Sequence, residues 1–414
     1  MKAIIGATLI DGTGSPEQPS SVVLINDSII NTVGNINDIH VPENTETIEA
    51  NGLTLLPGLI DCHDHLAQFT YDMVERMGLG ESPSKNNIAI TSVLNRTLES
   101  GYTTVRDAAG LNVGYKQAVD TGLIRGPNLQ VTLNFLTIFG GQANRTTPSG
   151  HTYSPPSHSD LPGGVANGPA AVREMVRELV RMGADAIKTA TTGWASEIPG
   201  LGPIDPVMHR DELEALVDEA HLLGRRVLCH AIGGSGQRLA VEVGVDSLDH
   251  GCYLDEDPDL IQLMLDKQIF YVPTFSVFTH HSEKGTPQSR FWTNQFKDHH
   301  SRSLRLARDA GIKIAAGTDE GGWQHGNNAR ELGLLVQHGL SPMEAIVAAT
   351  GNAAACLGLQ DTVGTIEPGK TADIILVSGN PLKDISILEW GVSTQLVMKG
   401  GSVVVDRRQN TNRP

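Results

Sequence analysis

The central part of the chain alternates between short apolar runs, typical of buried β-strands, and longer segments with the spacing of amphipathic helices. Several helical segments end in Gly, the residue favoured just past a helix. Eight such units predict an α/β fold, a (β/α)8 or TIM barrel. An open doubly wound sheet is the alternative, but no GxGxxG motif follows the first strand and the count of eight favours closure. The expected strands are residues 55–61, 103–108, 128–136, 184–190, 226–232, 246–251, 269–275 and 313–320.

Both ends of the 414-residue chain are rich in short β-like runs separated by turns such as Asp11-Gly12 and Asn51-Gly52. The length suits one large barrel with an accessory module. The two β-rich ends could pair into one small β-sandwich beside the barrel. The expected division is therefore a sandwich from residues 1–56 and 360–414 and a barrel from residues 57–359.

Charge and composition narrow the class of protein. The net charge of −16 argues against a nucleic-acid partner, because phosphates require a basic surface. We predict no membrane span, since no apolar run reaches about 18 residues. The first residues lack the apolar stretch and cleavage site of a signal peptide. The four cysteines are scattered without a CxxC motif, which favours reduced thiols in a cytoplasmic protein.

One segment interrupts the alternation. Residues 137–169 follow the third expected strand and are dense in Gly, Pro, Ser and Thr. A long loop at the carboxyl end of a barrel strand is more often functional than filler. We therefore expect a functional lid here.

Residues able to hold a metal stand at the expected strand ends. The first strand ends in His63-Asp64-His65, and residues i and i+2 of a strand share a face, so both imidazoles point inward. An HxH pair alone could equally be hydrogen-bonded core histidines. In a barrel, however, the carboxyl ends of all strands converge on one mouth. The candidate metal ligands are His63, His65, Lys188, His230, His250 and Asp319.

Lys188 requires separate treatment, because an ammonium has no lone pair to give to a metal. A lysine in an apolar strand is otherwise explained by a salt bridge or by a side chain that reaches solvent. If the amine reacts with carbon dioxide, it becomes a carbamate, an oxygen ligand able to bridge two cations.

This set resembles the amidohydrolase superfamily, with HxH after PGLID, a strand-four Lys, one His on each of strands five and six, and a strand-eight Asp. The segments GADAIK, GVDSLDHG, AAGTDEG and VGTIEPGKTADIILV are similar to the Xaa-Pro dipeptidase and imidazolonepropionase-like branch. The resemblance covers nearly the whole chain. It implies that both β-rich ends form one sandwich and that the enzyme forms multimers, here a homo-oligomer acting on a small-molecule substrate.

The resemblance also implies two divalent ions, usually Zn2+, bridged by carboxylated Lys188 and hydroxide. His63, His65 and Asp319 would hold one ion, and His230 and His250 the other. Carbamate, carboxylate and hydroxide would leave the centre a net charge of about one positive, able to activate water and polarise a carbonyl. We expect Asp319 and His250 to be catalytic, with Asp319 passing a proton from the attacking hydroxide to the leaving group.

The substrate is less defined. Relatives often carry Gly-Gly-His at the end of strand three and Ala-Tyr or Ala-His after the strand-five His, where this chain has Gly140-Gly141-Gln142 and Ala231-Ile232. Polar groups that could contact substrate instead are His151, Arg106, Arg145, Gln142, Trp323 and His325.

The favoured activity is cleavage of an amide C–N bond in a dipeptide, an N-acyl amino acid or a related xenobiotic or toxin amide. A hydrolase of a carbamate, lactone, cyclic amide or phosphotriester is the first alternative. A mononuclear deaminase is disfavoured, because such members of the superfamily generally lack the bridging Lys, and a non-enzymatic metal-binding protein has no need of Asp319.

Overall fold

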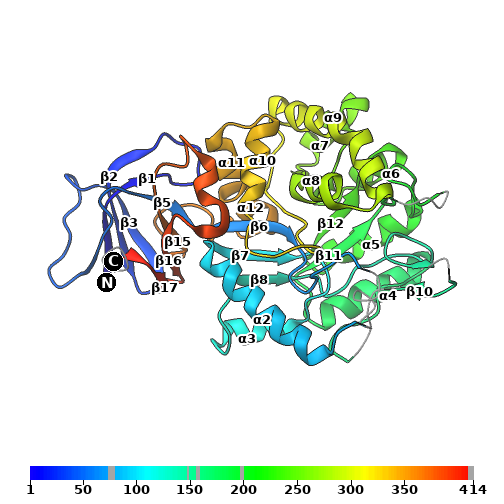
Figure 1. Cartoon of the computed structure of the whole chain (residues 1–414), viewed down its shortest axis with the longest axis horizontal. Helices are drawn as coiled ribbons and strands as arrows, with labels where there is room; N and C mark the ends of the chain where they lie inside the picture. The colour runs from blue at the N-terminus through cyan, green and yellow to red at the C-terminus, as the bar shows by residue number, and fades with distance from the viewer. Residues whose placement is uncertain (73–79, 147–148, 155–158, 196–199, 409–414) are drawn as a thin grey trace.

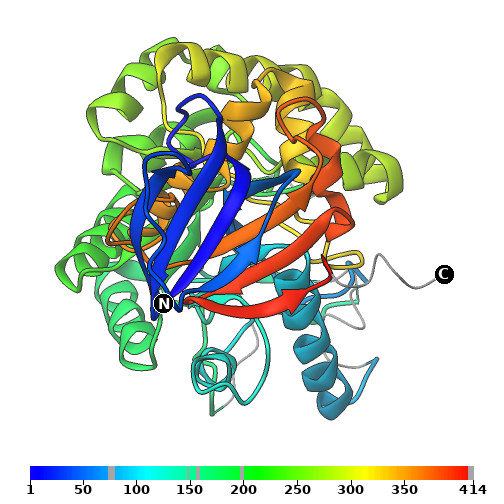
Figure 2. The same ribbon diagram turned by 90° about the vertical axis from the view of Figure 1, so that its left-hand side faces the viewer.

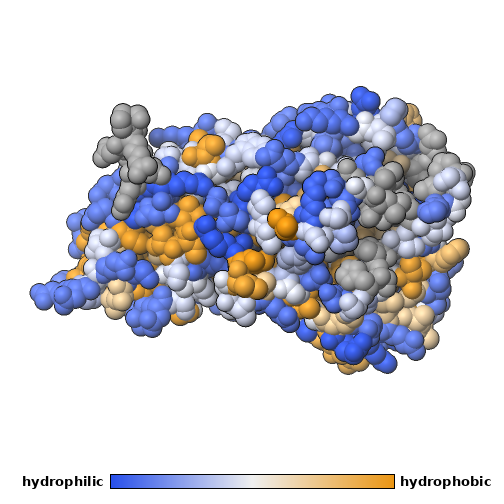
Figure 3. Space-filling model, turned by 60° about the horizontal axis from the view of Figure 1, so that its bottom comes forward, coloured by the Kyte–Doolittle hydropathy of each residue, from blue (hydrophilic) through white to orange (hydrophobic). Residues whose placement is uncertain are grey.

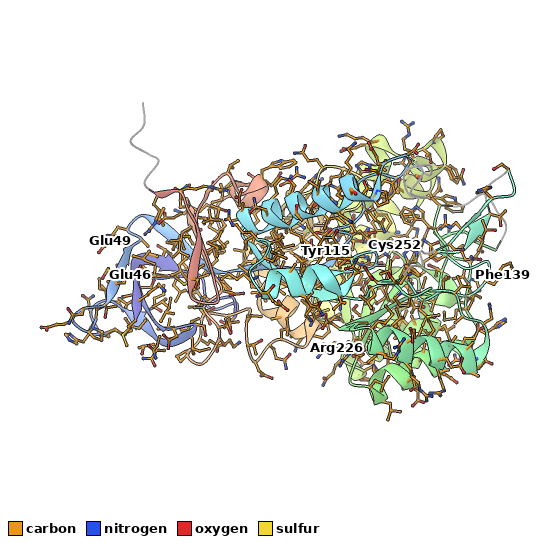
Figure 4. All side chains as sticks on the ribbon, turned by 90° about the horizontal axis from the view of Figure 1, so that it is seen from below. Glu46, Glu49, Tyr115, Phe139, Arg226 and Cys252 are labelled. Atoms are coloured by element: carbon orange, nitrogen blue, oxygen red, sulfur yellow. The ribbon has the colours of Figure 1, made fainter. Side chains whose placement is uncertain are left out.

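A computed structural model describes residues 1–72, 80–146, 149–154, 159–195 and 200–408. A β-sheet part lies at one end of an elongated molecule, and a larger part of strands wrapped by helices lies at the other (Figure 1). Glu46 and Glu49 mark the β-sheet end, and Phe139 marks the opposite end (Figure 4).

The β-sheet part joins strands from both ends of the chain in one eight-stranded sheet. The strand order is β17-β16-β15-β5-β1-β2-β3, with β4 paired to β1. Figure 2 shows the first strands in blue beside the last strands in red. Apolar side chains such as Ile4, Ile25 and Leu376 form its core. The strands are β1 (Lys2–Leu9), β2 (Gln18–Asn26), β3 (Ile29–Asn35), β4 (Glu46–Glu49), β5 (Leu53–Pro57), β15 (Ile374–Ser378), β16 (Thr394–Lys399) and β17 (Ser402–Asp406).

The larger part contains two parallel sheets, β6-β7-β8 and β11-β12-β13-β14. A bridge between Phe135 and Lys188 joins the two sheets. With helices on the outside, this arrangement is TIM-barrel-like. The strands are β6 (Leu59–Asp64), β7 (Tyr102–Asp107), β8 (Asn128–Val131), β11 (Ala186–Ala190), β12 (Arg226–Ala231), β13 (Ser247–His250) and β14 (Phe270–Val272).

The expected first strand is divided at Gly58. Residues up to Pro57 pair with β15 in the sandwich, whereas residues from Leu59 pair with β7 in the barrel. A Cβ atom at Gly58 would lie 2.1 Å from Thr103 Oγ1, so only glycine fits where the chain passes between the two parts.

The expected eighth strand, residues 313–320, is not a regular strand. It nevertheless runs between β14 and β6, because Tyr271 N–H donates to Lys313 O at 3.0 Å and Cys62 N–H to Ala316 O at 2.9 Å. Asp319 N–H also donates to His63 O at 2.7 Å. Asp319 has a left-handed backbone (φ 54°), which prevents a continuous strand to the end of the segment.

The helices surround the barrel strands (Figure 1). In α4, for example, the buried residues Val172, Val176 and Leu179 follow helical spacing and face the core. Among the described residues, none of the helices combines the length and apolar character needed to cross a bilayer. The helices are α2 (Pro83–Glu99), α3 (Val113–Asp120), α4 (Gly168–Arg181), α5 (Arg210–Leu222), α6 (Gly234–Val243), α7 (Pro258–Asp266), α8 (Phe275–Lys284), α9 (Pro287–Ala310), α10 (Arg330–His338), α11 (Pro342–Ala348) and α12 (Gly351–Leu357), with short 3-10 turns η1 (Leu254–Glu256) and η2 (Ile385–Gly391).

The described part of the long loop, residues 137–169, carries a small hairpin of β9 (Arg145–Thr146) and β10 (Thr152–Tyr153). The hairpin lies at the end of the barrel away from the sandwich (Figure 1). On the face shown in Figure 3, hydrophobic residues gather in separate patches over both parts of the molecule.

Candidate metal centre

Three of the predicted ligands meet directly at the carboxyl end of the barrel. His63, His65 and Asp319 each offer a ligand atom, and these atoms all lie within 4.8 Å of one another. Asp319 Oδ1 is 3.1 Å from His65 Nε2 and 3.6 Å from His63 Nε2. The inward direction predicted for both histidines of the HxH pair is therefore what the structure shows.

The other three predicted ligands adjoin this group. Lys188 Nζ is 3.3 Å from His63 Nε2. The His250 ring centroid lies 5.2 Å from that of His63 and 4.4 Å from that of His230. The structure thus gathers side chains from five elements of the barrel around one point.

Each of the four imidazoles has one ring nitrogen held by an acceptor outside this group. His65 Nδ1 lies 3.1 Å from the carbonyl oxygen of Ala109, and His230 Nε2 lies 3.0 Å from that of Gly193. A carbonyl can only accept, so these ring nitrogens carry the protons. The opposite nitrogens, His65 Nε2 and His230 Nδ1, keep their lone pairs, as in metal-ligating histidines.

The same logic applies to His63 and His250. His63 Nδ1 is 2.7 Å from Asp249 Oδ2. The Thr274 hydroxyl donates to Pro273 O at 2.7 Å, so it must accept from His250 Nδ1, which is 2.7 Å away. Both histidines therefore keep a lone pair on Nε2.

Burial favours the protonation states that a metal requires. It lowers the pKa of His63 to about 4 and that of His230 to about 3, so both imidazoles are neutral at pH 7. Burial also lowers the pKa of Lys188, which favours the uncharged amine. Burial alone would raise the pKa of Asp319, but His63 and His65 hold that pKa well below its usual range.

Two of the six residues have a strained backbone. His250 has a φ of 79° and Asp319 a φ of 54°, in the left-handed region that non-glycine residues rarely adopt. Such strain persists where surrounding structure imposes it, most often at functional sites. At His250 it breaks the strand alternation, so that Asp249 and His250 both turn toward His63.

A cavity of about 390 Å3 opens above the six residues and contains all of them in its lining. Gln142 and Arg145, from the long loop, form part of its wall. The expectation that this loop contributes to a site is therefore supported by the cavity. Aromatic and polar side chains complete the wall, namely Phe69, Tyr71, Asn134, Phe135, Trp194 and His281.

The other predicted substrate contacts lie elsewhere. Arg106 is buried and donates to Cys62 O at 2.7 Å. It lines a second cavity at the amino ends of β11 and β12, together with Arg226. His151 is exposed on the loop. Trp323 stacks on His280 with ring centroids 4.5 Å apart, and His325 is buried behind the centre. These four are absent from the described lining of the first cavity.

Sequence reasoning did not single out Asp249 or Thr274, which fix the tautomers of His63 and His250. Asp249 stands directly before a predicted ligand in Ser247-Leu248-Asp249-His250, and this was the available signal. It also missed the aromatic wall, because those residues come from three separate loops and from helix α8.

The donor set fits divalent metal ions. Imidazole nitrogens from four histidines gather around the ionised carboxylate of Asp319 in a buried to half-buried setting, and this is the donor type that divalent ions such as Zn2+ take. Lys188 Nζ lies among these groups, 3.3 Å from His63 Nε2 and 3.7 Å from Asp249 Oδ2.

Comparison with known proteins identifies the family. A profile of the Amidohydrolase family matches residues 54–404. The chain belongs to the amidohydrolase family. Ochratoxinase from Aspergillus niger is 32% identical over 97% of this chain and 86% of its own length. The crystal structure of that ochratoxinase has a TM-score of 0.87, with 30% identity over 98% of this chain and 95% of that chain.

Two further relatives match the predicted branch. A Xaa-Pro dipeptidase crystallised with methionine in its active site has a TM-score of 0.86 and 31% identity, over 97% of this chain and 99% of that chain. Imidazolonepropionase from Fusobacterium nucleatum subsp. nucleatum is 25% identical, over 87% of this chain and 85% of its own length. The predicted resemblance is confirmed, and the amidohydrolase is a metal-dependent enzyme for amide bonds.

Proposed function

We propose that this amidohydrolase holds two Zn2+ ions, bridged by carboxylated Lys188, and cleaves the amide of an amino acid that bears a free carboxylate. The observation that carries the metal assignment is the position of Lys188 Nζ, 3.3 Å from His63 Nε2 and surrounded by imidazoles. Lys188 Nζ also lies 3.7 Å from Asp249 Oδ2, so an ammonium there could pair with these acceptors but would have no lone pair for a metal. A carbamate would supply the oxygen ligands instead.

His63, His65 and Asp319 would hold one ion, and His230 and His250 the other, with Lys188 between them. When bound, divalent ions lower the pKa of water and polarise the substrate carbonyl. Asp319 is ionised and 18% exposed at the cavity floor, so its carboxylate can take a proton and return it to the leaving nitrogen. Asp249 and Thr274 keep His63 and His250 in the required tautomers.

The cavity wall supports an amide with one bulky apolar group and one carboxylate. Phe69, Tyr71 and Trp194 provide aromatic surface in the wall. Ile232, at the position where relatives often carry a polar Tyr or His, packs into the neighbouring aromatic cluster. Arg145 provides a guanidinium in the same wall, and its hydrogen bond to Gln142 O at 2.8 Å orients it. The similarity to ochratoxinase and to a Xaa-Pro dipeptidase agrees with such a substrate.

A substrate panel tests this assignment. We expect turnover of N-acyl amino acids and dipeptides with aromatic or bulky acyl groups, measured with Zn2+ present by release of free amine. Lactones, carbamates and phosphotriesters should react slowly. If only lactones or phosphotriesters are hydrolysed, the amidase assignment is wrong and the alternative hydrolase holds.

Replacing Arg145 tests the carboxylate contact. In Arg145→Leu we expect KM for a carboxylate-bearing amide to rise about 10- to 100-fold, since a charged hydrogen bond contributes about 1.5–3 kcal/mol. The matching substrate with a neutral carboxamide should be unaffected. Arg181→Leu, which removes an exposed arginine paired with Glu178, is the control and should leave both KM values unchanged. An equal loss for both substrates would assign Arg145 to the loop structure instead.

The closure of the barrel, the domain bounds, the cellular location and the oligomeric state form a second part of the proposal. We propose that residues 57–359 close into one (β/α)8 barrel, supported by the bridges Phe135–Lys188, Tyr271–Ile314 and Asp64–Glu320 around the ring. The sandwich would comprise residues 1–56 and 360–414, supported by the shared sheet. The four buried free cysteines agree with the proposed cytoplasmic location. A homo-oligomer remains a proposal from the family resemblance.

A further inference from the structure

Three other metal-capable side chains converge immediately behind the catalytic group. Asp64 ends β6, Glu320 follows Asp319, and His325 belongs to the next loop. A parallel bridge pairs Asp64 with Glu320. All three side chains are at most 1% exposed, and one ligand atom from each lies within 4.8 Å of the other two. They lie outside the described lining of the catalytic cavity.

The atoms that face one another in this group all carry lone pairs. His325 Nε2 lies 2.7 Å from Gln68 O, which can only accept, so Nε2 carries the ring proton. His325 Nδ1 is then an unprotonated nitrogen in the neutral imidazole. It lies 3.6 Å from Asp64 Oδ1 and 3.6 Å from Glu320 Oε2.

Neither contact is a hydrogen bond. Within the described part of the chain, no donor reaches Asp64 Oδ1 or His325 Nδ1. Leaving two such buried atoms unpaired is costly, because each has lost its hydration without a replacement. The unpaired atoms point at the same small space, so one ligand would satisfy both.

The remaining contacts hold the carboxylates in place. Asn328 Nδ2 donates to Asp64 Oδ2 at 2.8 Å. Gly326 N–H donates to Glu320 Oε2 at 3.4 Å, and the Trp323 side chain also hydrogen-bonds Glu320. Arg96 in α2 adds positive charge near Glu320 and His325. Hydrogen bonds to neighbouring residues therefore hold all three side chains in the orientation that a bound cation would need.

We propose that Asp64, Glu320 and His325 bind a third divalent cation, Zn2+ in a zinc-loaded protein, separate from the catalytic ions. Around a tetrahedral ion with bonds of about 2.0–2.2 Å, neighbouring ligand atoms are about 3.3–3.6 Å apart. The observed 3.6 Å separations match that spacing and exceed the length of a direct N–H···O bond. The His325 N–H donated to a backbone carbonyl is the arrangement typical of metal-ligating histidines.

Such an ion would have a positioning role. Two carboxylates would balance its charge, and the site has no described opening to the catalytic cavity for substrate. The ion would link the end of β6, which carries the HxH pair, to the segment that carries Asp319 and to the following loop that carries His325. It would thereby fix the spacing between the HxH pair and Asp319.

The test loads the full-length protein with Zn2+, removes unbound metal, and measures zinc per chain by mass spectrometry. The variants are His325→Gln and, as a control, His221→Gln. His221 also pairs with a carboxylate, Asp246 at 2.8 Å, but stands alone on the surface. We expect wild type and His221→Gln to hold one more zinc per chain than His325→Gln. A His65→Ala variant should lose zinc from the catalytic centre and keep the third ion, so failure of the two sites can be told apart.

A crystal of the zinc-loaded wild type gives a second measurement that does not depend on any variant folding. Anomalous scattering at the zinc edge should show a peak about 2.0–2.4 Å from Asp64 Oδ1, Glu320 Oε2 and His325 Nδ1. Equal zinc content in wild type and His325→Gln, or a zinc-loaded crystal without that peak, would overturn the proposal.

Discussion

Removing divalent metal from the purified enzyme is expected to abolish amide hydrolysis. The centre has candidate metal ligands and, in Asp319, a proposed proton carrier, whereas the described lining of the cavity offers no serine or cysteine that could act as a nucleophile instead of water. Water activation and carbonyl polarisation both depend on the ions. We expect the rate to fall about 10⁴-fold after treatment with a strong chelator, or about 5 kcal/mol of transition-state stabilisation.

Adding Zn2+ back should restore the rate, with other divalent ions compared at equal concentration to identify the preferred metal. Circular dichroism before and after chelation separates loss of catalysis from loss of fold. The same chelator presaturated with Ca2+ is the control for direct inhibition by the reagent. Full turnover in protein shown to be metal-free would refute the metal-dependent mechanism.

The second large effect is expected from Lys188→Ala. This substitution removes the proposed bridging group while leaving a small apolar residue in β11, whose neighbours Ile187 and Thr189 are unchanged. We expect kcat/KM to fall about 10³-fold, because the ions lose the ligand that holds them together. A short carboxylic acid such as acetate or propionate fits the vacated space and can replace the carbamate oxygens. Activity should therefore return in part, and saturably, as the acid is added.

Lys313→Ala is the matched control, since Lys313 is an exposed lysine at the start of the eighth barrel segment. It should retain wild-type activity and show no response to carboxylic acids. Wild-type protein incubated with 13C-bicarbonate should give a carbamate resonance by NMR that Lys188→Ala lacks. Unchanged activity in Lys188→Ala would remove the bridge from the mechanism, and loss without rescue would indicate a structural role for the lysine.

The convergence of the six candidate metal ligands was largely predictable from local sequence. The HxH pair needs only the two-residue repeat of a strand to place His63 and His65 on one face. The other ligands each end a short apolar run, and parallel strands bring their carboxyl ends to one mouth. The position of the long loop near the mouth of the barrel was predictable for the same reason, and its residues Gln142 and Arg145 line the cavity.

Substrate contacts were less predictable. Arg106 lies within β7, and its position in the sequence does not indicate which way its side chain points. In the structure its guanidinium donates to Cys62 O and does not reach the catalytic cavity. Trp323 and His325 follow Asp319 closely in sequence, yet Trp323 stacks on His280 and His325 Nε2 is held by Gln68 O, so that neither belongs to the described lining of the cavity. Side chains on loops have no periodicity that fixes their direction.

The amino-acid sequence by itself determined the alternation of strands and helices and the placing of the six candidate ligands at expected strand ends. These follow from short-range periodicity and from the parallel order of strands. The tertiary structure alone decided that Asp249 and His250 both turn inward, through the left-handed backbone at His250. It also decided that Asp64, Glu320 and His325 meet, because the first and last barrel segments pair across more than 250 residues of chain, and no local pattern encodes that contact.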